Sequence, residues 1–322
     1  MRLLTALAEI YNPDQRLDRV VESELGADGW EISRTTSVDS DALAGVDAML
    51  VMMLPVPSEA IVRADSLRLI QAASRGYDAI DIEAAARRGI PVCNVHTAGH
   101  ADTVAEHTFA LLLAVAKQVP AGHAGIVSGG WPAPALVGAG LSELVGKTIG
   151  LVGLGEIGKQ VARRADAFGM HLVYADEVAD AVLECRYGMR RLSLDDLLTV
   201  SDVVSLHVPL TEATAGLIGG RELALMKPRA IVVNTSRGPV VDLDALASAL
   251  HDGRVRAGLD VFDPEPPPAG HPILSAPGLV CSPHIGGVTT EMVERVLRDG
   301  VQNLRRLQRG EPIRHVVNGV SP

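Results

Sequence analysis

The sequence predicts an α/β protein built from two doubly wound domains, each with a parallel sheet between helices. Short apolar runs alternate with helix-like segments along most of the 322 residues, which is typical of βαβ units. The hydrophobic fraction is 47% and the aromatic fraction only 3%, and such an aliphatic composition suits strands that are buried on both faces. The length allows one large or two ordinary domains.

Residues 1–98 contain the elements of the first expected domain. The N-terminal run MRLLTALAEI is interpreted as a strand, because it lacks the extended apolar region and the cleavage site of a signal peptide. Short apolar runs bounded by turn residues predict three further strands, and an alanine-rich segment that ends at a glycine predicts a helix. The strands are expected at 47–54, 67–74 and 90–95, and the helix at 80–89.

A long helix and a second series of strands follow. The helix is expected to begin with Asp102 or Thr103 as its N-cap and to continue to about Gln118. A stretch rich in glycine and proline then extends to Leu141. Six apolar runs with helical segments between them predict a doubly wound nucleotide-binding sheet. These runs are 148–154, 171–175, 203–208, 230–235, 256–262 and 278–282.

The last predicted helix, residues 289–309, is charged and amphipathic. We expect it to return to the first domain, which makes that domain discontinuous. The predicted domains are therefore 1–98 plus 287–322, and 99–286.

The most informative single motif is the glycine pattern of Gly153, Gly155 and Gly158, which follows an apolar strand and opens a helix. In this context the first glycine allows a tight turn, the second lets the backbone approach a pyrophosphate, and the third lets the helix pack against the strand. The helix N-terminus favours an anion through its unpaired N–H groups and its dipole. The motif therefore predicts a dinucleotide cofactor in the domain 99–286.

Asp176 indicates which dinucleotide is bound. It ends the next strand, 176 − 158 = 18 positions after the last glycine, where an acidic residue binds the adenosine ribose hydroxyls. A carboxylate at this place repels a 2′-phosphate. The sequence therefore predicts NAD rather than NADP.

Three ionisable residues directly follow late strands of the same expected sheet. They are Arg237 in NTSRG, Glu265 in DVFDPEP and His284 in SPHIGG. Side chains at the carboxyl ends of parallel strands face the cofactor crevice, so these three residues are the candidates for catalysis.

With these motifs the chain resembles the D-isomer-specific 2-hydroxyacid dehydrogenases. The resemblance implies two Rossmann-like or flavodoxin-like domains with an active-site cleft between them, of which the discontinuous one binds the substrate. It implies hydride transfer between the nicotinamide of NAD and C2 of a D-2-hydroxy acid or its 2-oxo acid, in a homodimer formed largely through the cofactor domain. The segments that carry the resemblance cover nearly the whole chain: RGYDAIDIEAAARRGIPVCN, VAEHTFALLLA, GLGEIG, HVPLTEAT, MKPRAIVVNTSRGPVVD, AGLDVFDPEP and SPHIGG.

Carried over position by position, the resemblance implies that Arg237 binds the substrate carboxylate and polarises the C2 oxygen. A guanidinium suits this role because it can place two N–H donors on planar oxygens. His284 is implied as the acid and base that exchanges a proton with the substrate oxygen, and imidazoles ordinarily titrate near neutral pH. Glu265 is implied as the partner that orients His284 and favours its protonated form. Asp263 lies nearby, but the family has a glutamate directly before a proline, and Glu265 matches it.

The resemblance also extends the expected cofactor-binding set. His207 with Pro209 is expected to line the adenine side, and no role is expected for the remaining histidines. His96, His100 and His107 lie close together in the sequence, but no cysteine or carboxylate at a suitable spacing completes a metal site, so no metal is predicted. The added cofactor-binding residues are Thr103, Glu156, Ile157, His207, Pro209, Thr214, Thr235, Ser236, Arg237, Asp260, His284 and Gly286.

The loop Ser74-Arg75-Gly76 departs from the family. In the family this loop contributes backbone N–H groups to the substrate carboxylate, and most relatives have a small or apolar residue where Arg75 stands. A second cation beside Arg237 predicts a substrate with two anionic groups, such as a phosphonate-bearing oxo acid like phosphonopyruvate, or a dicarboxylate. The alternative is that Arg75 points to solvent or pairs with Asp78.

Phosphite oxidation is a further alternative. The phosphite dehydrogenase branch of the family has a lysine at the position of Arg75, and the segment around Trp131 also resembles that branch. The extra arginine of that branch is not clearly in register after His284, where Arg295 is the nearest candidate.

The composition disfavours several other classes of protein. The formal net charge is −10 and no basic stretch is present, which disfavours nucleic acids and anionic membranes as partners. No apolar run reaches the roughly 20 residues that span a bilayer. Cys93, Cys185 and Cys281 lack metal-type spacing, so we expect buried thiols, no disulfides and a cytoplasmic compartment.

A non-enzymatic NAD-sensing corepressor is the alternative from another functional class, because such proteins share this scaffold. They usually have extra segments for peptide-motif partners, and none is evident here. The presence of Arg237, Glu265 and His284 together favours the enzyme.

Overall fold

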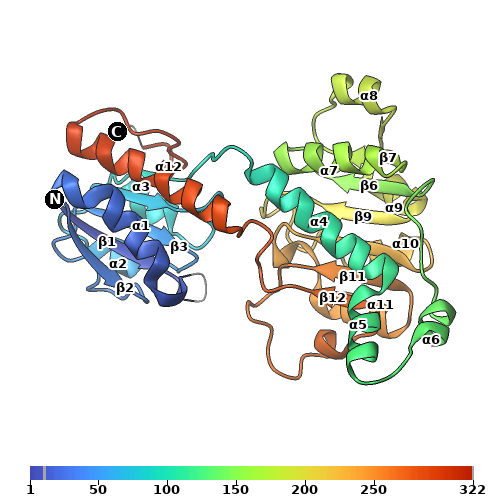
Figure 1. The fold of residues 1–322 in the computed structure, drawn as a ribbon. Coiled ribbons are helices and arrows are strands. Elements are labelled where there is room, and N and C mark those ends of the chain that lie inside the picture. The colour runs from blue at the N-terminus through green and yellow to red at the C-terminus, as the bar shows by residue number, and fades with distance from the viewer. Residues whose placement is uncertain (10–11, 321–322) are drawn as a thin grey trace. The chain divides into compact units, whose positions relative to one another are not determined.

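A computed structural model of the chain describes residues 1–9 and 12–320. The chain divides into two compact units, drawn in Figure 1. Unit 1 contains Met1–His100 and Thr289–Pro322, and unit 2 contains Ala101–Val288. The boundaries expected from the sequence, after residues 98 and 286, lie two residues earlier in both places.

Unit 1 contains a five-stranded sheet with the order β2-β1-β3-β4-β5. Every pair of neighbouring strands is parallel, which is a doubly wound arrangement as the sequence predicts. Aliphatic side chains fill its core. The strands are β1 (Arg2–Leu7), β2 (Glu31–Thr35), β3 (Ala48–Met52), β4 (Leu69–Ala72) and β5 (Val92–Cys93).

The edge strand β2 is absent from the sequence prediction. Its residues, EISRT, include one aliphatic side chain and are mostly exposed, so no apolar run signals a strand. Backbone pairing with β1, from Arg2 with Glu31 to Ala6 with Thr35, makes the segment a strand. An edge strand with few buried side chains depends on its neighbour more than on its own pattern.

The last helix of the chain belongs to unit 1, where it contacts α1 and β4. The Thr289 hydroxyl caps it by accepting a hydrogen bond from the N–H of Met292 at 3.1 Å, and Gly310 ends it in a left-handed conformation with φ 67°. The helices of unit 1 are α1 (Arg16–Leu25), α2 (Ser58–Arg63), α3 (Ile82–Arg87) and α12 (Thr290–Arg309).

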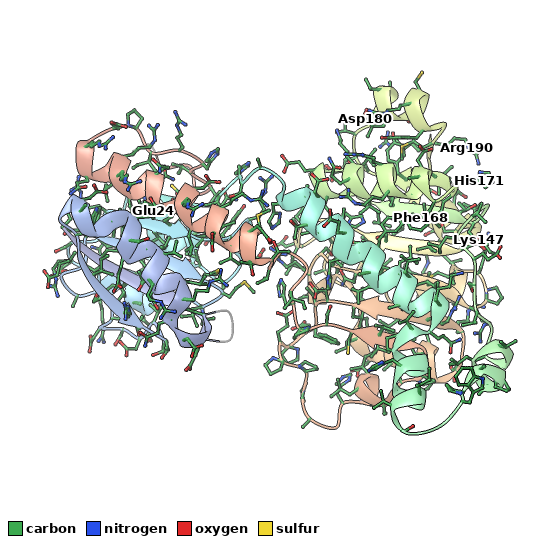
Figure 2. All side chains as sticks on the ribbon, viewed as in Figure 1. Glu24, Lys147, Phe168, His171, Asp180 and Arg190 are labelled. Carbon is green, nitrogen blue, oxygen red and sulfur yellow. The ribbon has the colours of Figure 1, made fainter. Side chains whose placement is uncertain are left out.

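Charged pairs join α12 to α1. Glu24, labelled in Figure 2, lies on α1 beside α12, and its carboxylate is 3.4 Å from Arg305 Nη1 and 3.5 Å from Arg298 Nε. Arg305 Nε also lies 2.8 Å from Asp28 Oδ2. These pairs join residues from the two separate segments of unit 1, so they help to hold the discontinuous unit together.

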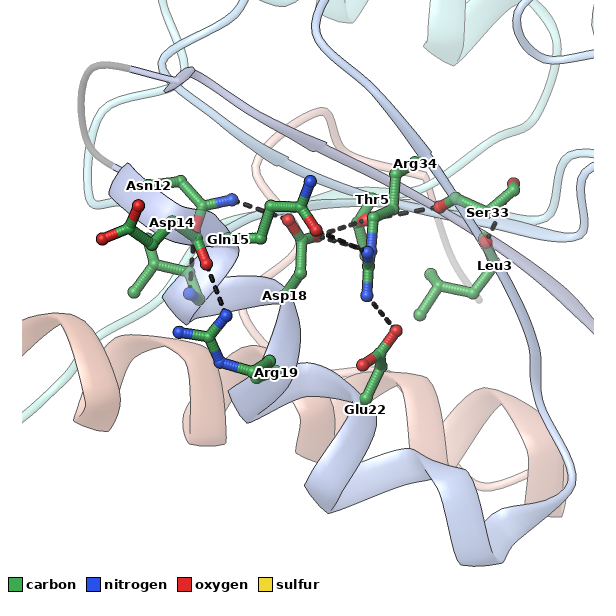
Figure 3. A network of polar contacts seen from close by, with 11 residues as sticks. Leu3, Thr5, Asn12, Asp14, Gln15, Asp18, Arg19, Glu22, Ser33 and Arg34 are labelled. Carbon is green, nitrogen blue, oxygen red and sulfur yellow. Dashed lines mark hydrogen bonds and ion pairs between the residues drawn. The ribbon is translucent and has the colours of Figure 1, made fainter.

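A buried carboxylate connects α1 to β1, to β2 and to the loop residue Asn12 (Figure 3). Asp18 on α1 is 6% exposed. It accepts hydrogen bonds from Thr5 Oγ1 of β1 at 2.9 Å and from Asn12 Nδ2 at 2.7 Å, and Arg34 Nε of β2 lies 3.6 Å away. The carboxylate is satisfied by these partners, as a buried charge must be.

Unit 2 contains a seven-stranded parallel sheet with the order β12-β11-β10-β9-β6-β7-β8. The strand order reverses between β6 and β9, and ligands of open α/β sheets bind at such a switch point, beyond the carboxyl ends of the strands. The strands are β6 (Thr148–Val152), β7 (His171–Ala175), β8 (Arg190–Arg191), β9 (Val203–Leu206), β10 (Ala230–Asn234), β11 (Val255–Leu259) and β12 (Leu279–Cys281).

Two clusters of aliphatic side chains form the core of unit 2. One cluster contains the buried face of α4 and includes Phe109 and Tyr174, and the other contains α11. The helices are α4 (His100–Lys117), α5 (Val119–Val127), α6 (Ala133–Gly138), α7 (Glu156–Ala167), α8 (Ala181–Tyr187), α9 (Leu194–Val200), α10 (Gly220–Leu225) and α11 (Leu243–His251).

Several sequence predictions in unit 2 are wrong in detail. Helix α4 begins at His100, so neither Asp102 nor Thr103 is its N-cap. The glycine- and proline-rich stretch contains α5 and α6, and β8 adds a seventh strand of only two residues. Cys185 and Cys281 are exposed, and only Cys93 is buried. Helix α8 has no fully buried residue, and Cys185 lies on its exposed side.

Within residues 1–9 and 12–320, no single helix is long and apolar enough to cross a membrane. The pair α4 and α5, bent by 63°, satisfies the length and composition criteria together.

Candidate active site

Nearly all the residues predicted to bind the cofactor or act in catalysis lie at one end of the unit 2 sheet, where the strands have their carboxyl ends. Lys147 and His171, labelled in Figure 2, mark the opposite end, at the starts of β6 and β7. Thr103 is the exception, because it lies in the first turn of α4. The others follow β6, β7, β9, β10, β11 and β12: Gly153, Gly155, Glu156, Ile157, Gly158, Asp176, His207, Pro209, Thr214, Thr235, Ser236, Arg237, Asp260, Glu265, His284 and Gly286.

The glycine loop between β6 and α7 leaves no room for side chains at two of its three glycines. Gly153 has φ +93°, and a Cβ there would lie 2.8 Å from the backbone carbonyl of His207. A Cβ on Gly158 would lie 2.3 Å from the Gly153 oxygen, because the helix packs directly on the turn. A Cβ on Gly155 would meet nothing within 4 Å. Gly155 is the N-cap of α7, so its open side can face an anion at the helix N-terminus.

Asp176 and His207 flank this loop. Asp176 Oδ2 accepts a hydrogen bond from the Leu154 N–H at 2.7 Å, and Oδ1 accepts one from the Val178 N–H at 3.1 Å. Each carboxylate oxygen can accept a second bond, so the carboxylate can still bind ribose hydroxyls. His207 Nε2 lies 2.8 Å from Ser205 Oγ, and burial lowers the pKa of His207 to about 3. His207 is therefore a neutral group beside this loop.

The Arg237 loop is held by buried polar contacts after β10. Asn234 Nδ2 donates to the Arg237 carbonyl at 2.9 Å, and Asn234 Oδ1 accepts from the N–H and the hydroxyl of Ser236. Arg237 Nη1 donates to the Ser236 carbonyl at 2.7 Å. At Gly238 a Cβ would lie 1.8 Å from the Phe262 carbonyl oxygen, so this loop and the one after β11 touch backbone to backbone.

Glu265 and His284 form a pair, as the resemblance to the family implies. His284 Nδ1 lies 2.7 Å from Glu265 Oε2, and the Phe262 N–H donates to Glu265 Oε1 at 3.0 Å. Burial alone would raise the pKa of Glu265, but the hydrogen bonds from His284 and Phe262 outweigh it, and the pKa is lowered. Glu265 is therefore a carboxylate that accepts from Nδ1–H and directs Nε2 of the same ring to another partner.

Asp260 organises the loop that carries His284. The Asp260 carbonyl accepts from the His284 N–H at 2.8 Å. Its carboxylate, 2% exposed, accepts from the N–H groups of Ile285 and Gly286 at 2.9 and 2.8 Å and from the Ser282 hydroxyl at 2.6 Å. Burial would raise the pKa of Asp260, but its contacts with His107 and Ser282 and the two backbone hydrogen bonds outweigh burial, and the pKa is lowered.

The predicted substrate loop lies in unit 1, after β4. Ser74 Oγ donates to the Gly76 carbonyl at 2.6 Å, and Asn94 Nδ2 donates to the Arg75 carbonyl at 2.9 Å. Arg75 Nη1 lies 2.6 Å from His96 Nδ1, and the His96 ring stacks on His315 at 4.5 Å. A guanidinium can only donate, so His96 Nδ1 is the acceptor. Arg75 thus has a defined position at the carboxyl end of β4.

Comparison with known proteins identifies the family to which the chain belongs. Residues 109–286, just over half of the chain, match the NAD binding domain of the D-isomer specific 2-hydroxyacid dehydrogenases. The chain belongs to this family. The sequence motifs predicted this family. The match to an NAD binding domain agrees with the glycine loop, which is open at Gly155, and with the carboxylate of Asp176.

Two relatives and one solved structure illustrate the spread of the 2-hydroxyacid dehydrogenase family. Glyoxylate reductase of Korarchaeum cryptofilum is 38% identical over 95% of this chain and 93% of that protein. D-3-phosphoglycerate dehydrogenase of Mycobacterium tuberculosis is also 38% identical over 94% of this chain, but the chain spans only 58% of its length. NAD-dependent formate dehydrogenase from Staphylococcus aureus, solved with NAD, has a TM-score of 0.86 and 29% identity, with 98% and 97% of the two chains covered.

Sequence reasoning missed three residues that organise this site in the 2-hydroxyacid dehydrogenase fold. Asn234, Ser282 and His107 touch the site loops through side-chain hydrogen bonds. Asn234 and Ser282 lie inside motifs that were recognised, but a motif alone does not show which of its residues hold its backbone. His107 was assigned no role, because its partners lie far away in sequence. Among the described residues, no group of three or more His, Cys, Asp or Glu side chains could hold a metal ion.

The carboxylate of Asp176 leads to a testable prediction about cofactor choice. We expect Asp176→Ser to raise KM for NADH by about 10-fold, because charge-assisted hydrogen bonds to ribose are lost. KM for NADPH should fall, since the charge that repels a 2′-phosphate is gone. Steady-state kinetics with both cofactors measures the preference.

Two comparisons make the Asp176 test specific. Glu177→Ser removes the exposed neighbouring carboxylate and should leave the cofactor preference unchanged. An unchanged ratio of NADH to NADPH efficiency in Asp176→Ser, in a variant that unfolds like the wild type, would contradict the assignment.

Proposed function

We propose that the protein is an NAD-dependent oxidoreductase that transfers a hydride between the nicotinamide and C2 of a D-2-hydroxy acid or its 2-oxo acid. The observation that carries the proposal is the pair of His284 Nδ1 and Glu265 Oε2 at 2.7 Å, next to the loop of Arg237 at the same end of one sheet. A carboxylate-supported imidazole beside a guanidinium provides both a proton and a binding site for a carboxylate.

In the direction of reduction, NADH supplies the hydride that reaches C2 when the cofactor is bound. His284 Nε2–H gives its proton to the C2 oxygen, so that the carbonyl gains one hydride and one proton and becomes a hydroxyl. Glu265 stabilises the imidazolium before this transfer, because an ionised carboxylate favours the charged form of a hydrogen-bonded ring. Arg237 binds the substrate carboxylate and draws charge from the C2 oxygen. Oxidation follows the same steps in reverse.

A substrate screen tests this proposal. The purified chain is mixed with NADH and, separately, with glyoxylate, pyruvate, hydroxypyruvate, oxaloacetate and phosphonopyruvate, and the loss of NADH absorbance is followed. Phosphite with NAD is included as a separate arm. Turnover of at least one 2-oxo acid supports the dehydrogenase. Turnover of phosphite alone would assign the chain to that chemistry, and NADH binding without any turnover would favour an NAD-sensing protein.

A second candidate concerns the substrate. We propose that it carries a second anionic group, which Arg75 binds. The support is the position of the guanidinium, held by His96 at the carboxyl end of β4, and the similarity to a D-3-phosphoglycerate dehydrogenase, whose named substrate is a phosphorylated hydroxy acid. The equally similar glyoxylate reductase makes a singly charged substrate the competing possibility.

The predicted effect of Arg75 is selective. We expect Arg75→Ala to raise KM for phosphonopyruvate by about 10- to 100-fold, the range for losing a charge-assisted hydrogen bond, and KM for glyoxylate by less than about 3-fold. Arg68→Ala is the matched control, because Arg68 is exposed and precedes β4 instead of following it. Equal changes for the two substrates would contradict a second anionic group.

We further propose that the protein is a homodimer that associates through α5 and α6. Residues 119–141 contain no Asp, Glu, Lys or Arg, and neither helix has a buried residue. Exposed apolar side chains gather here, with Trp131 78% exposed. An uncharged apolar surface is suited to a second copy of itself, which buries both copies by one symmetric contact. The members of this surface are Val119, Ile126, Val127, Trp131, Val137 and Leu141.

The dimer leads to a prediction that can be measured by sedimentation velocity. We expect Trp131→Glu to convert the dimer to a monomer, because a buried unpaired charge at an interface costs several kcal/mol. Val182→Glu, at a similarly exposed position on α8, should leave the dimer intact. A wild-type chain that sediments as a monomer at micromolar concentration would refute the proposal.

A further inference from the structure

A second histidine lies one hydrogen bond from the loop that carries His284. His107, on α4, places Nε2 2.7 Å from Ser282 Oγ and 3.3 Å from Asp260 Oδ1. Its side chain is only 20% exposed. The proposed hydride and proton transfers do not involve His107. Its hydrogen bonds to the loop of His284 therefore serve another purpose.

The direction of these hydrogen bonds follows from the chemistry of the three groups. Asp260, whose pKa is lowered, is an ionised carboxylate that can only accept, so the Ser282 hydroxyl donates its proton across the 2.6 Å to Asp260 Oδ1. The Ser282 oxygen then accepts from His107, which must carry a proton on Nε2. Donation therefore runs from His107 to Ser282 to Asp260.

Asp260, which accepts the hydrogen bond from Ser282, also binds the backbone at His284. His284 has φ 54°, in the left-handed region that few residues other than glycine adopt. Its own N–H is bonded to the Asp260 carbonyl, and the next N–H, of Ile285, is bonded to Asp260 Oδ1. A strained backbone conformation persists where surrounding contacts hold it in place. Asp260 holds His284 in this way, through hydrogen bonds from the N–H groups of His284 and of Ile285.

Close packing around Gly286 restricts the conformation of the same loop. A Cβ on Gly286 would lie 2.8 Å from Asp260 Oδ2 and 3.3 Å from His107 Cδ2. The next residue of α4, Thr108, hydrogen-bonds Thr235 Oγ1 at 2.9 Å, two residues before Arg237. Adjacent residues of α4 thus contact the loops that carry Arg237 and His284.

We infer that His107 is a positioning residue for His284, acting through Ser282 and Asp260. It holds the loop so that the His284 ring keeps its 2.7 Å contact with Glu265. This inference depends on the proposed function only in experiments that measure turnover. Titratable groups in contact with this loop include Glu265, Asp260 and His107.

The experiment compares His107→Leu, His107→Gln and Ser282→Ala with the wild type. The amide of Gln can still donate to Ser282, whereas Leu cannot. We expect His107→Leu and Ser282→Ala to lower kcat by about 10-fold or more, the scale of a small misplacement of a catalytic group, with KM nearly unchanged. His107→Gln should recover most of the loss. His171→Leu, at the other end of the sheet, is the control.

The pH profile separates positioning from a general loss of structure. Reduction requires protonated His284, so its rate falls as pH rises. If the contact with Glu265 weakens, the imidazolium loses support and this fall occurs at lower pH. We expect the profile of His107→Leu to move part of the way toward that of Glu265→Gln, which removes the carboxylate charge directly. A loss of folded protein alone would lower the amplitude without moving the profile.

Histidine NMR on the protein without substrate keeps this inference distinct from the proposed function. The titration midpoint of the His284 ring, assigned with His284→Asn, should move to lower pH in His107→Leu and Ser282→Ala. An unmoved midpoint and an unmoved profile would overturn the positioning role, even in an active enzyme. A moved midpoint in a protein that turns over no 2-oxo acid would support the positioning role and remove the proposed function.

Discussion

Replacing His284 with alanine is expected to lower kcat for 2-oxo acid reduction by about 10²- to 10⁴-fold, the range for removing a general acid. Glu265 and Asp260 cannot replace His284 as the proton donor, since the pKa values of both are lowered and both are ionised acceptors. The affinity for NADH should fall far less than kcat, because the glycine loop and Asp176, which follow β6 and β7, are unchanged. Stopped-flow reduction and NADH fluorescence titration measure the two quantities.

Two controls define what the His284 variant shows. His171→Ala, an exposed histidine at the start of β7, should retain full activity. Added imidazole should restore part of the activity of His284→Ala if the missing function is proton transfer. A variant that keeps activity within about 3-fold of the wild type would exclude His284 as the acid, because general acid catalysis contributes far more.

Gly238→Ala is expected to destabilise the protein by about 3 kcal/mol or more and to abolish activity, because overpacking against rigid backbone is among the costlier core changes. The added Cβ would lie 1.8 Å from the Phe262 oxygen and 2.1 Å from its carbonyl carbon, and backbone atoms cannot rotate away. The loops after β10 and β11 must separate. Because the Phe262 N–H holds Glu265, Arg237 and Glu265 should move together. Urea unfolding and kcat/KM measure both effects.

Gly26→Ala is the matched control for this substitution. Gly26 has φ −59°, and a Cβ there would meet nothing within 4 Å. The change should be neutral, or stabilising by about 0.5 kcal/mol through the unfolded state. A Gly238→Ala variant that unfolds at the same urea concentration as the wild type and remains active would show that the two loops are not packed as described.

The sequence predicted the strands of both sheets where side chains are buried on both faces. The run HLVYA is β7 without a residue added or removed, because parallel strands in a core require continuous apolar residues. It did not predict β2 or β8, which lie at sheet edges with exposed side chains. It also did not predict α5 and α6, since helices without a buried face lack the periodic pattern that reveals a helix.

The candidate site divides in a similar way. Gly153, Gly158, Asp176, Arg237, Glu265 and His284 could be named from the sequence, because each lies in a short motif whose chemistry depends on neighbours along the chain. Asn234, Ser282 and His107 could not, since their roles depend on hydrogen bonds to other segments. The reason for Gly238 is also tertiary, because the atoms that exclude a side chain belong to Phe262.

The sequence by itself determined the family, the NAD binding domain and the identity of the proposed catalytic side chains, because local motifs specify turns, charges and strand ends. Only the tertiary structure decided how these groups are held. His284 contacts Glu265 at 2.7 Å, and Asp260 hydrogen-bonds the backbone of the His284 loop. His107 hydrogen-bonds the same loop. These contacts depend on strands and a helix that are far apart in the chain. Hydrogen bonds act over about 3 Å, and only the folded chain brings such groups within that distance.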